Sequence, residues 1–487
     1  MRLRTTTLAL AALTVAGATP LTLASPASAA PAKFADDFNG DGYRDLVTAA
    51  PMATVGGAKY AGAVVVNYGS ASGISAARSA VISQNTSGIP GTAEQEDEFG
   101  RTLASGDLNN DGYADLVVGT EQEDVDGDTD SGTVVVVWGG ASGLSGGLTI
   151  ADPAAAAGAG YGQSLAVGDF GGDGRVDLAV GSRGKDIRIH EGGFTKSSGA
   201  ASTQKLATDL YTSDAGSSSY GAQNLAAGDI NGDGTADLVI SGQYNPGPGT
   251  YDDGTLVYLG SASGSGLTFQ TFLRNEAWRL AAVGDLNADG YADVVTSAAP
   301  GSVREGDGGS VKAYLGSASG VRTSPQTTIT QDSEGVPGVD EPEDWFGDSL
   351  SVGDVNGDGY ADVAVGALYE KVGDTAQTGS VTVLRGSATG LTGTGSQAFS
   401  QATEGVPGSA EANDFFGSSV RLADHNGDGK ADLSVGAPGE NDANGAVWNL
   451  RGASSGVTTT GALSFGPSAV GVPTVDYPRL GFTLLRN

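Results

Sequence analysis

Cysteine is absent from the 487 residues, and histidine occurs only twice. Without cysteine no disulfide can cross-link the chain, so stability has to come from the core and from any bound ions. The histidines, His190 and His425, lie far apart in the sequence. The usual arrangements of nucleophile and base are therefore missing. We expect a protein that is not an enzyme.

Basic residues are also scarce. Lysine and arginine number 25 against 57 acidic residues, a formal net charge of -32. Such a charge disfavours nucleic acid and anionic membranes as partners, and it strains a compact fold unless cations bind. No stretch after the N-terminal region approaches the length of a membrane span, and the C-terminal YPRLGFTLLRN carries no hydrophobic tail. We expect no membrane span and no nucleic acid, and a monomer.

The N-terminal region has the pattern of a secretory signal peptide. Arg2 and Arg4 precede an apolar stretch from Leu8 to about Ala18, and Ala27-Ser28-Ala29 offers a small-x-small cleavage site. This pattern predicts a signal peptide at residues 1–29 and a secreted, extracellular protein. The remaining residues, 30–487, are expected to form a single domain.

One acidic pattern, Asp-x-Asn-x-Asp-Gly-x-x-Asp, recurs seven times with small departures. The copies run from Asp37 to Asp45, Asp107 to Asp115, Asp169 to Asp177, Asp229 to Asp237, Asp285 to Asp293, Asp354 to Asp362 and Asp424 to Asp432. Their first aspartates are 70, 62, 60, 56, 69 and 70 residues apart. Spacing this regular indicates a repeat architecture rather than several domains.

Each repeat also holds four strand-length segments separated by glycine-rich turns. A Phe-Gly or Tyr-Gly pair, as at Phe99-Gly100, precedes most of the acidic loops, and the fifth repeat has Trp278 instead. Runs such as VVVV at 134–137 lack the alternation of a half-exposed strand, so we expect both faces to be covered. The pattern predicts an all-β fold, a seven-bladed β-propeller of four-stranded antiparallel blades.

The chain ends suggest how the ring closes. The C-terminal sequence begins an eighth copy of the repeat that stops before its aspartate. The segment 480–487 is therefore expected to close the propeller by supplying or reinforcing the first strand of blade one. Residues 30–36 align with the same position, so the sequence leaves open which segment takes it.

The acidic loops have the donors of a calcium site. Positions 1, 3 and 5 of a tight loop offer side-chain oxygens, position 7 a backbone carbonyl, and the aspartate at position 9 completes the set. Glycine at position 6 permits the sharp reversal. Asp-Gly and Asn-Gly also favour plain hairpin turns, but a turn does not require aspartate at position 9. Position 12 of the second loop is Val118 rather than glutamate, which excludes an EF-hand.

We therefore predict Ca²⁺ at about seven sites. The expected ligands are Asp37, Asn39, Asp41, Tyr43 and Asp45; Asp107, Asn109, Asp111, Tyr113 and Asp115; Asp169, Asp173, Arg175 and Asp177; Asp229, Asn231, Asp233, Thr235 and Asp237; Asp285, Asn287, Asp289, Tyr291 and Asp293; Asp354, Asn356, Asp358, Tyr360 and Asp362; and Asp424, Asn426, Asp428, Lys430 and Asp432. Gly171 leaves the Asp169 loop without a position-3 oxygen, so this site is expected to be the weakest. His425, at position 2 of the seventh loop, is expected on the surface.

Together these motifs resemble the FG-GAP repeats of the integrin α-subunit head, a seven-bladed propeller. The resemblance implies calcium on the lower face and ligands on the upper face, at loops such as 120–132, 241–254 and 366–379. Within these loops, Tyr244, Tyr251 and Tyr369 are either aromatic contacts or plain surface residues. The acidic run Asp124, Asp126, Asp128 and Asp130 is either a further ion site or, as we expect, a solvated loop. We expect no counterpart of the later integrin β-sandwich domains or membrane span in residues 30–487.

The sequence favours a secreted, calcium-binding, integrin-α-like propeller that acts as an extracellular adhesion or ligand-binding module. Its ligand is expected to be a protein or a glycan on the face opposite the calcium loops. The alternative is an extracellular propeller hydrolase that acts on a polymer or lipid. The sequence does not name the ligand.

Overall fold

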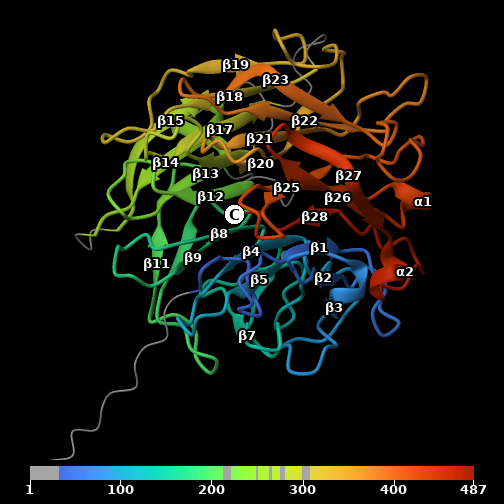
Figure 1. Cartoon of the computed structure of the whole chain (residues 1–487). Helices are drawn as coiled ribbons and strands as arrows, with labels where there is room; N and C mark the ends of the chain where they lie inside the picture. The colour runs from blue at the N-terminus through green and yellow to red at the C-terminus, as the bar shows by residue number, and fades with distance from the viewer. Residues whose placement is uncertain are drawn as a thin grey trace, which may run out of the picture.

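The chain forms a ring of seven four-stranded antiparallel sheets. In Figure 1 the first strands of the blades surround a common axis and the later strands lie outside them. This computed structural model describes residues 32–486 except 212–220, 248–249, 263–265, 275–279 and 299–307. The prediction of an all-β, seven-bladed propeller is confirmed. The signal peptide and Trp278 lie outside the described residues.

The blades are numbered in chain order, and their strands are given from the axis outwards. Blade one holds β28 (Thr483–Leu484), β1 (Leu46–Ala50), β2 (Ala63–Asn67) and β3 (Ser79–Ile82). Blade two holds β4 (Thr102–Gly106), β5 (Asp115–Thr120), β6 (Thr133–Val137) and β7 (Gly147–Ile150). Blade three holds β8 (Ser164–Gly168), β9 (Asp177–Gly181), β10 (Ile187–Glu191) and β11 (Ser202–Leu206). Blade four holds β12 (Asn224–Gly228), β13 (Asp237–Gly247), β14 (Thr250–Leu259) and β15 (Thr268–Arg274).

The remaining three blades follow the same order. Blade five holds β16 (Ala281–Gly284), β17 (Asp293–Ala298), β18 (Ser310–Tyr314) and β19 (Thr327–Ile329). Blade six holds β20 (Phe346–Gly353), β21 (Asp362–Ala367), β22 (Ser380–Arg385) and β23 (Thr392–Phe399). Blade seven holds β24 (Ser419–Ala423), β25 (Asp432–Ala437), β26 (Ala446–Ala453) and β27 (Gly456–Phe465). The described helices are short: η1 (Ala76–Arg78), α1 (Glu440–Ala443) and α2 (Pro467–Val470).

Blade one is built from both ends of the described chain. Its innermost strand, β28, pairs antiparallel with β1, with Thr48 opposite Leu484 and Ala49 opposite Thr483. Residues 32–36 form bends and turns rather than a strand. The first-strand position of blade one, which the sequence left open, is therefore taken by the C-terminal segment.

The core lies between neighbouring blades. All five residues of β2 and of β6 are buried, as the VVVV run predicted. Val64 on β2 belongs to the same buried cluster as Phe99 and Leu116 of the next blade. Because both faces of the middle strands are covered, each blade is stabilised by its neighbours on either side.

The Phe-Gly pairs form a repeated joint between blades. The amide of Phe99 donates to the carbonyl of Ala61 at 2.9 Å, just before β2 of the preceding blade. Gly62, which follows Ala61, has a φ of +88°, and a Cβ there would lie 2.3 Å from the Phe99 nitrogen. The close backbone approach and the positive φ both require glycine at this position.

The antiparallel order defines two faces. The acidic loop between the first and second strands of a blade lies at the same end as the turn between the third and fourth strands. We call this end the lower face. The loops between the second and third strands, and the connectors to the next blade, lie at the opposite end, the upper face.

Candidate metal centres and the central cavity

The first aspartate of every acidic loop organises the backbone of that loop. In the first loop, Asp37 accepts hydrogen bonds from the amides of Asp41 at 3.2 Å and Gly42 at 2.8 Å. The same pair of bonds is found at Asp107, Asp169, Asp229, Asp285, Asp354 and Asp424. All seven loops therefore share one conformation, including the loop in blade four.

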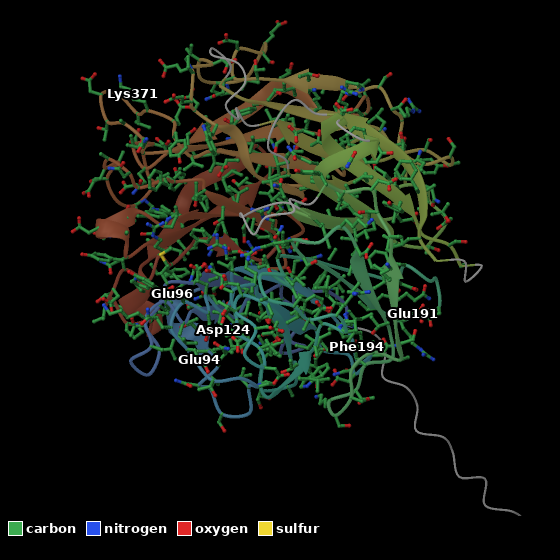
Figure 2. All side chains as sticks on the ribbon, turned by 180° about the vertical axis from the view of Figure 1, so that it is seen from behind. Glu94, Glu96, Asp124, Glu191, Phe194 and Lys371 are labelled. Carbon is green, nitrogen blue, oxygen red and sulfur yellow. The ribbon has the colours of Figure 1, made fainter. Side chains whose placement is uncertain are left out.

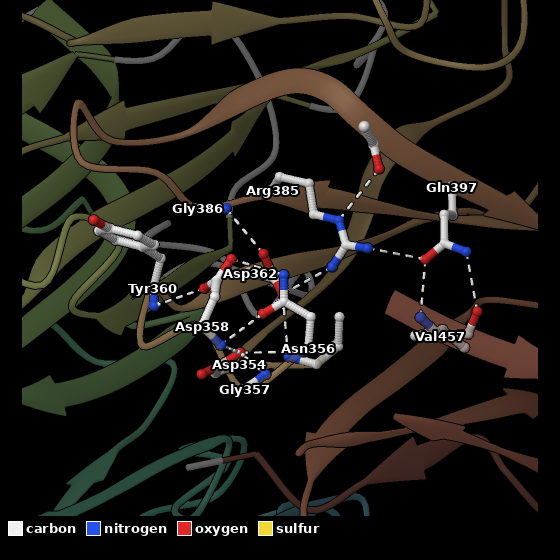
Figure 3. Close-up of polar contacts among 12 residues, drawn as sticks. Asp354, Asn356, Gly357, Asp358, Tyr360, Asp362, Arg385, Gly386, Gln397 and Val457 are labelled. Carbon is white, nitrogen blue, oxygen red and sulfur yellow. Dashed lines mark hydrogen bonds and ion pairs between the residues drawn. The ribbon is translucent and has the colours of Figure 1, made fainter. Parts of the chain in front are cut away.

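Positions 3 and 5 also turn their oxygens into the loop. In the sixth loop, Asn356 accepts from the Asp358 amide at 2.9 Å, and Asp358 accepts from the Tyr360 amide at 3.0 Å (Figure 3). The third loop keeps the bond from Arg175 to Asp173 but has no side-chain oxygen at Gly171. With position 1 counted, six loops thus present inward oxygens from three side chains, and the third loop presents them from two.

Glycine at position 6 is required by backbone conformation rather than by space. Gly42 has a φ of +88°, and a Cβ added there would meet nothing within 4 Å. The matching glycines of the other loops also have positive φ: Gly112, Gly174, Gly234, Gly290, Gly359 and Gly429. A residue with a side chain is disfavoured in this conformation.

The aspartate at position 9 is buried and has a structural role that the sequence did not predict. Asp45 accepts hydrogen bonds from the amide of Phe38 at 3.0 Å and from that of Gly69 at 2.9 Å. Gly69 lies in the turn between the third and fourth strands, so the aspartate joins two turns of the lower face. The equivalent glycine amides bond Asp115, Asp177, Asp237, Asp293, Asp362 and Asp432. Each oxygen of the Asp45 carboxylate accepts one of these bonds and keeps a lone pair for a further ligand.

Burial makes these position-9 carboxylates costly to ionise. Burial raises the pKa of Asp45 to about 8, and the nearby Asp37 and Asp41 carboxylates add to the effect. Burial likewise raises the pKa of Asp115 and Asp432 to about 7. A bound cation would favour the charged forms. The loops therefore fit a hard divalent ion for three reasons. Their donors are oxygens, these oxygens point into the loop, and the buried carboxylates are stabilised by positive charge.

The sixth loop already has a cationic partner. Arg385, at the end of β22, places Nη1 3.2 Å from Oδ2 of Asp362 (Figure 3). The guanidinium also contacts Oε1 of Gln397 at 3.2 Å. Part of the negative charge of this loop is therefore balanced by the protein itself.

The prediction that His425 lies on the surface is wrong. Its exposed fraction is 0%, and its Nδ1 donates to the carbonyl oxygen of Arg44 at 3.0 Å. Burial lowers its pKa to about 4. Position 2 does point away from the acidic cage, but it points into the packing between blades. The other loops place apolar residues there, all buried: Phe38, Leu108, Phe170, Ile230, Leu286 and Val355.

A cavity of about 1080 Å³ occupies the centre of the ring. On one side of its upper rim, Tyr369 contacts Trp345 edge to face at a centroid distance of 5.0 Å and Phe415 at 5.7 Å. On another side, Arg101 Nε lies 2.9 Å from Oε1 of Glu121. The cavity combines aromatic faces with charged hydrogen-bonding groups. Glu121 and Tyr369 belong to loops 120–132 and 366–379, which the resemblance assigned to the upper face, whereas Trp345 and Phe415 were not predicted from the sequence.

The other residues proposed for the upper face lie elsewhere. Tyr244 packs against Phe272 at a centroid distance of 4.7 Å, and the side chain of Tyr251 lies outside the described residues. Asp126 and Asp128 are exposed. The Asp130 amide donates to Asp124 at 2.9 Å, and the Asp124 side chain, labelled in Figure 2, is exposed. This loop has the character of a solvated acidic loop.

Seven blades that carry the same acidic loop define a repeat-built β-propeller. The FG-GAP repeat model matches residues 34–66, 99–137, 161–202, 277–315, 346–384 and 416–450. The chain is an FG-GAP repeat protein with an integrin-α-like propeller. Blade four is not matched, yet it has the same strand order and the same hydrogen bonds in its acidic loop as the others.

The chain is similar to several integrin α chains. It is 31% identical over 230 residues to integrin alpha pat-2 of Caenorhabditis elegans, covering 42% of this chain and 18% of that protein. It is 32% identical over 232 residues to integrin alpha-5 of Xenopus laevis, covering 45% and 20%. The matched region thus spans a fifth or less of these relatives.

The chain also has distant likeness to solved structures. The exotype rhamnogalacturonan lyase YesX aligns with a TM-score of 0.31 and 13% identity, over 66% of this chain and 64% of that chain. At this TM-score the likeness carries no argument about function. Within the described residues, no helix has the length and apolar character needed to cross a membrane.

Proposed function

We propose that the chain is a secreted, calcium-loaded propeller that binds an extracellular protein or glycan at the upper face. The central cavity carries this proposal, because it joins the Trp345, Tyr369 and Phe415 rings to the hydrogen-bonding side chains of Arg101 and Glu121. Aromatic rings with a few fixed polar groups are typical of ligand pockets. The similarity to integrin α chains supports an extracellular binding role.

In the lower-face loops, calcium would be held by the side chains at positions 1, 3, 5 and 9 and by the carbonyl of position 7. Bound Ca²⁺ supplies positive charge that balances buried carboxylates. The residues themselves fix the loop, because the position-1 and position-9 aspartates bond backbone amides on both sides of it. In this proposal the calcium loops support the ring, and ligand binding takes place at the opposite end.

We favour a binding module over a hydrolase. Neither histidine lines the cavity. His190 contacts the Tyr161 hydroxyl at 2.6 Å, and burial lowers its pKa to about 4. His425 is buried at the junction with Arg44. Both histidines are thus held by buried contacts away from the site where a substrate would bind.

A glycan and extracellular-protein array probed with the calcium-loaded chain tests this function. We expect stable, saturable binding to one ligand class. A parallel screen against polysaccharide and lipid substrates covers the hydrolase alternative. Turnover without stable binding would overturn the proposal and favour the hydrolase.

A further inference from the structure

A second acidic pattern repeats in this chain, separate from the calcium loops. It consists of a glutamine, then a glutamate 10 residues later, an aspartate after 3 more and a second glutamate after a further 26. The three copies are Gln84, Glu94, Asp97 and Glu123; Gln331, Glu341, Asp344 and Glu370; and Gln401, Glu411, Asp414 and Glu440. Spacing this constant indicates that the four residues act together.

Each copy lies on the upper face at a junction between two blades. The glutamine follows the outermost strand of one blade, and the first glutamate and the aspartate belong to the connector that leads to the next blade. The last glutamate begins the loop between the second and third strands of that next blade. The junctions are those between blades one and two, five and six, and six and seven. We call these three groups of residues the junction clusters.

The cluster between blades five and six brings three carboxylates together. Glu341, Asp344 and Glu370 each offer an oxygen, and these oxygens lie within 4.8 Å of one another. Two oxygens bound to the same calcium ion at about 2.4 Å can be at most about 4.8 Å apart. The three carboxylates can therefore share one ion. Glu341 is exposed, so an ion can reach the cluster from solvent.

The glutamine of this cluster is buried with one end unsatisfied. Gln331 is 3% exposed, its Nε2 lies 2.5 Å from Oε2 of Glu370, and its Oε1 has no hydrogen-bond partner. Leaving a buried amide oxygen without a donor or a cation is costly. A half-turn of the amide brings Oε1 to the Glu370 carboxylate. The amide oxygen and the carboxylate oxygen would then repel each other unless a cation or a proton lay between them.

The other two clusters repeat the contact between the glutamine and the last glutamate, but among the described residues three carboxylate oxygens within 4.8 Å of one another are found only between blades five and six. Gln84 Nε2 lies 2.6 Å from Oε2 of Glu123, and Gln401 Nε2 lies 2.6 Å from Oε2 of Glu440. Gln401 Nε2 also donates to the Ser409 carbonyl at 3.2 Å, a contact that the other two glutamines do not share. The Oε1 atoms of both glutamines are also buried without a partner. In each cluster the aspartate uses Oδ2 to accept the amide of the glutamate three residues before it, which fixes its orientation. The unsatisfied oxygen is thus a feature of the motif rather than of one side chain.

Electrostatics also favour a cation at these junctions. Burial raises the pKa of Glu370 to about 7, and the Asp344 and Glu341 carboxylates raise it further. Glu123 and Glu440 show the same shift for the same leading cause. A divalent cation would remove the repulsion among the carboxylates and satisfy the glutamine oxygen at once.

We propose that the junction cluster between blades five and six is a second class of calcium site, in which one glutamine oxygen and three carboxylates bind a hard divalent cation, and that the two clusters with the same motif close around a cation in the same way. This class goes beyond the seven lower-face loops, because it lies on the opposite face and uses residues from two blades. The cation would join the end of one blade to the connector and loop of the next. In the cluster between blades five and six, Asp344 and Glu370 adjoin Trp345 and Tyr369 in sequence. Ion binding would therefore fix part of the cavity rim.

Crystals of the full chain soaked in Tb³⁺, which replaces Ca²⁺ at oxygen sites and scatters anomalously, test the proposal directly. We expect an anomalous peak among Glu341, Asp344, Glu370 and Gln331, and equivalent peaks at the other two junctions. Crystals in which the lower-face loops are filled but the junction clusters carry no peak would overturn it.

Counting bound calcium by native mass spectrometry gives a second measurement. The Glu370→Gln variant should bind one ion fewer than the wild type, and the triple variant Glu123→Gln, Glu370→Gln and Glu440→Gln three fewer. Asp374→Asn is the matched control, because Asp374 is an exposed carboxylate in the same loop as Glu370. An unchanged count in the triple variant would show that a proton rather than a cation occupies the clusters. If the triple variant fails to fold, the crystal experiment on the wild type decides.

Discussion

Arg421 on β24 and Asp36 near the start of the described chain form a buried ion pair, with Nη2 2.7 Å from Oδ2. The other oxygen of Asp36 contacts Arg44 Nη1, also at 2.7 Å. One carboxylate thus connects blade seven to the segment that leads into blade one. This contact lies at the closure of the ring, where β28 also pairs with β1.

Replacing Asp36 should destabilise the ring strongly. Asp36→Asn removes the carboxylate that two arginines share, and breaking a buried ion pair from one side costs about 3–5 kcal/mol. Urea unfolding of the variant against the wild type measures this cost. Asp476→Asn is the control, because Asp476 pairs with Lys59, whose side chain is 56% exposed, and surface pairs contribute little. Equal effects of the two substitutions would contradict the structural role of Asp36.

Removing calcium should lower the melting temperature, and adding it back should restore the original value. A site held at about tenfold above its dissociation constant stabilises the fold by roughly 1.4 kcal/mol, so several filled loops act strongly together. Differential scanning calorimetry with chelator and then with excess calcium measures the change. Identical melts under both conditions would refute the calcium assignment.

The third loop should bind calcium more weakly than the others. Gly171 gives it one side-chain oxygen fewer. The measurement is a calcium titration followed by native mass spectrometry. Compared with the wild type, Asp173→Asn should lower the number of bound calcium ions only at high calcium concentration, whereas Asp233→Asn should lower it already at low concentration. The reverse order would show that the position-3 oxygen does not determine affinity.

Gly62 should tolerate alanine far less than Gly57 does. Both have positive φ, but a Cβ at Gly62 would lie 2.3 Å from the Phe99 nitrogen, whereas a Cβ at Gly57 would meet nothing within 4 Å. Gly57→Ala therefore reports backbone strain alone, of about 1 kcal/mol. We expect Gly62→Ala to cost at least about 2 kcal/mol more in urea unfolding, because it also separates two blades. If Gly62→Ala and Gly57→Ala destabilised the protein equally, the backbone at the contact between Gly62 and Phe99 would be able to move apart at little cost.

Stability should fall between pH 6.5 and pH 4 in part because of His190. Burial lowers its pKa from 6.5 to about 4, so the unfolded chain binds the proton first as the pH decreases. Neutral His190 therefore makes its full contribution to the free energy of unfolding above pH 6.5. Below pH 6.5 this contribution declines, by up to about 3 kcal/mol in total. His190→Gln should show a shallower pH dependence of unfolding than the wild type. Parallel curves would exclude this histidine as the cause.

Trp345→Ala should weaken ligand binding at the central cavity at least tenfold, since central aromatic side chains carry much of the binding energy in such sites. The assay is surface plasmon resonance with the ligand that the array identifies. Tyr244→Ala is the control, because Tyr244 packs on Phe272 rather than on the cavity. Equal losses in both variants would place the ligand elsewhere.

The sequence by itself determined the repeat number, the fold class and the positions of the acidic loops. The seven repeats are regularly spaced, and their middle strands are apolar on both faces. A closed ring of blades is the simplest arrangement that covers both faces of these strands. Position-1 aspartates such as Asp37 and the glycine at position 6 were also predictable, because a loop of nine residues makes its own hydrogen bonds. The spacing of the junction clusters could be read in the sequence as well, but without a fold it carries no meaning.

Only the tertiary structure decided how distant segments meet. It showed that Asp45 bonds Gly69 across the blade, that His425 is buried between blades, and that β28 takes the first place in blade one. It also brought Glu341 and Glu370 to one junction and Trp345, Tyr369 and Phe415 to one cavity. The reason is physical: local hydrogen bonds follow from neighbouring residues, whereas burial and side-chain contacts depend on how whole sheets pack around the ring.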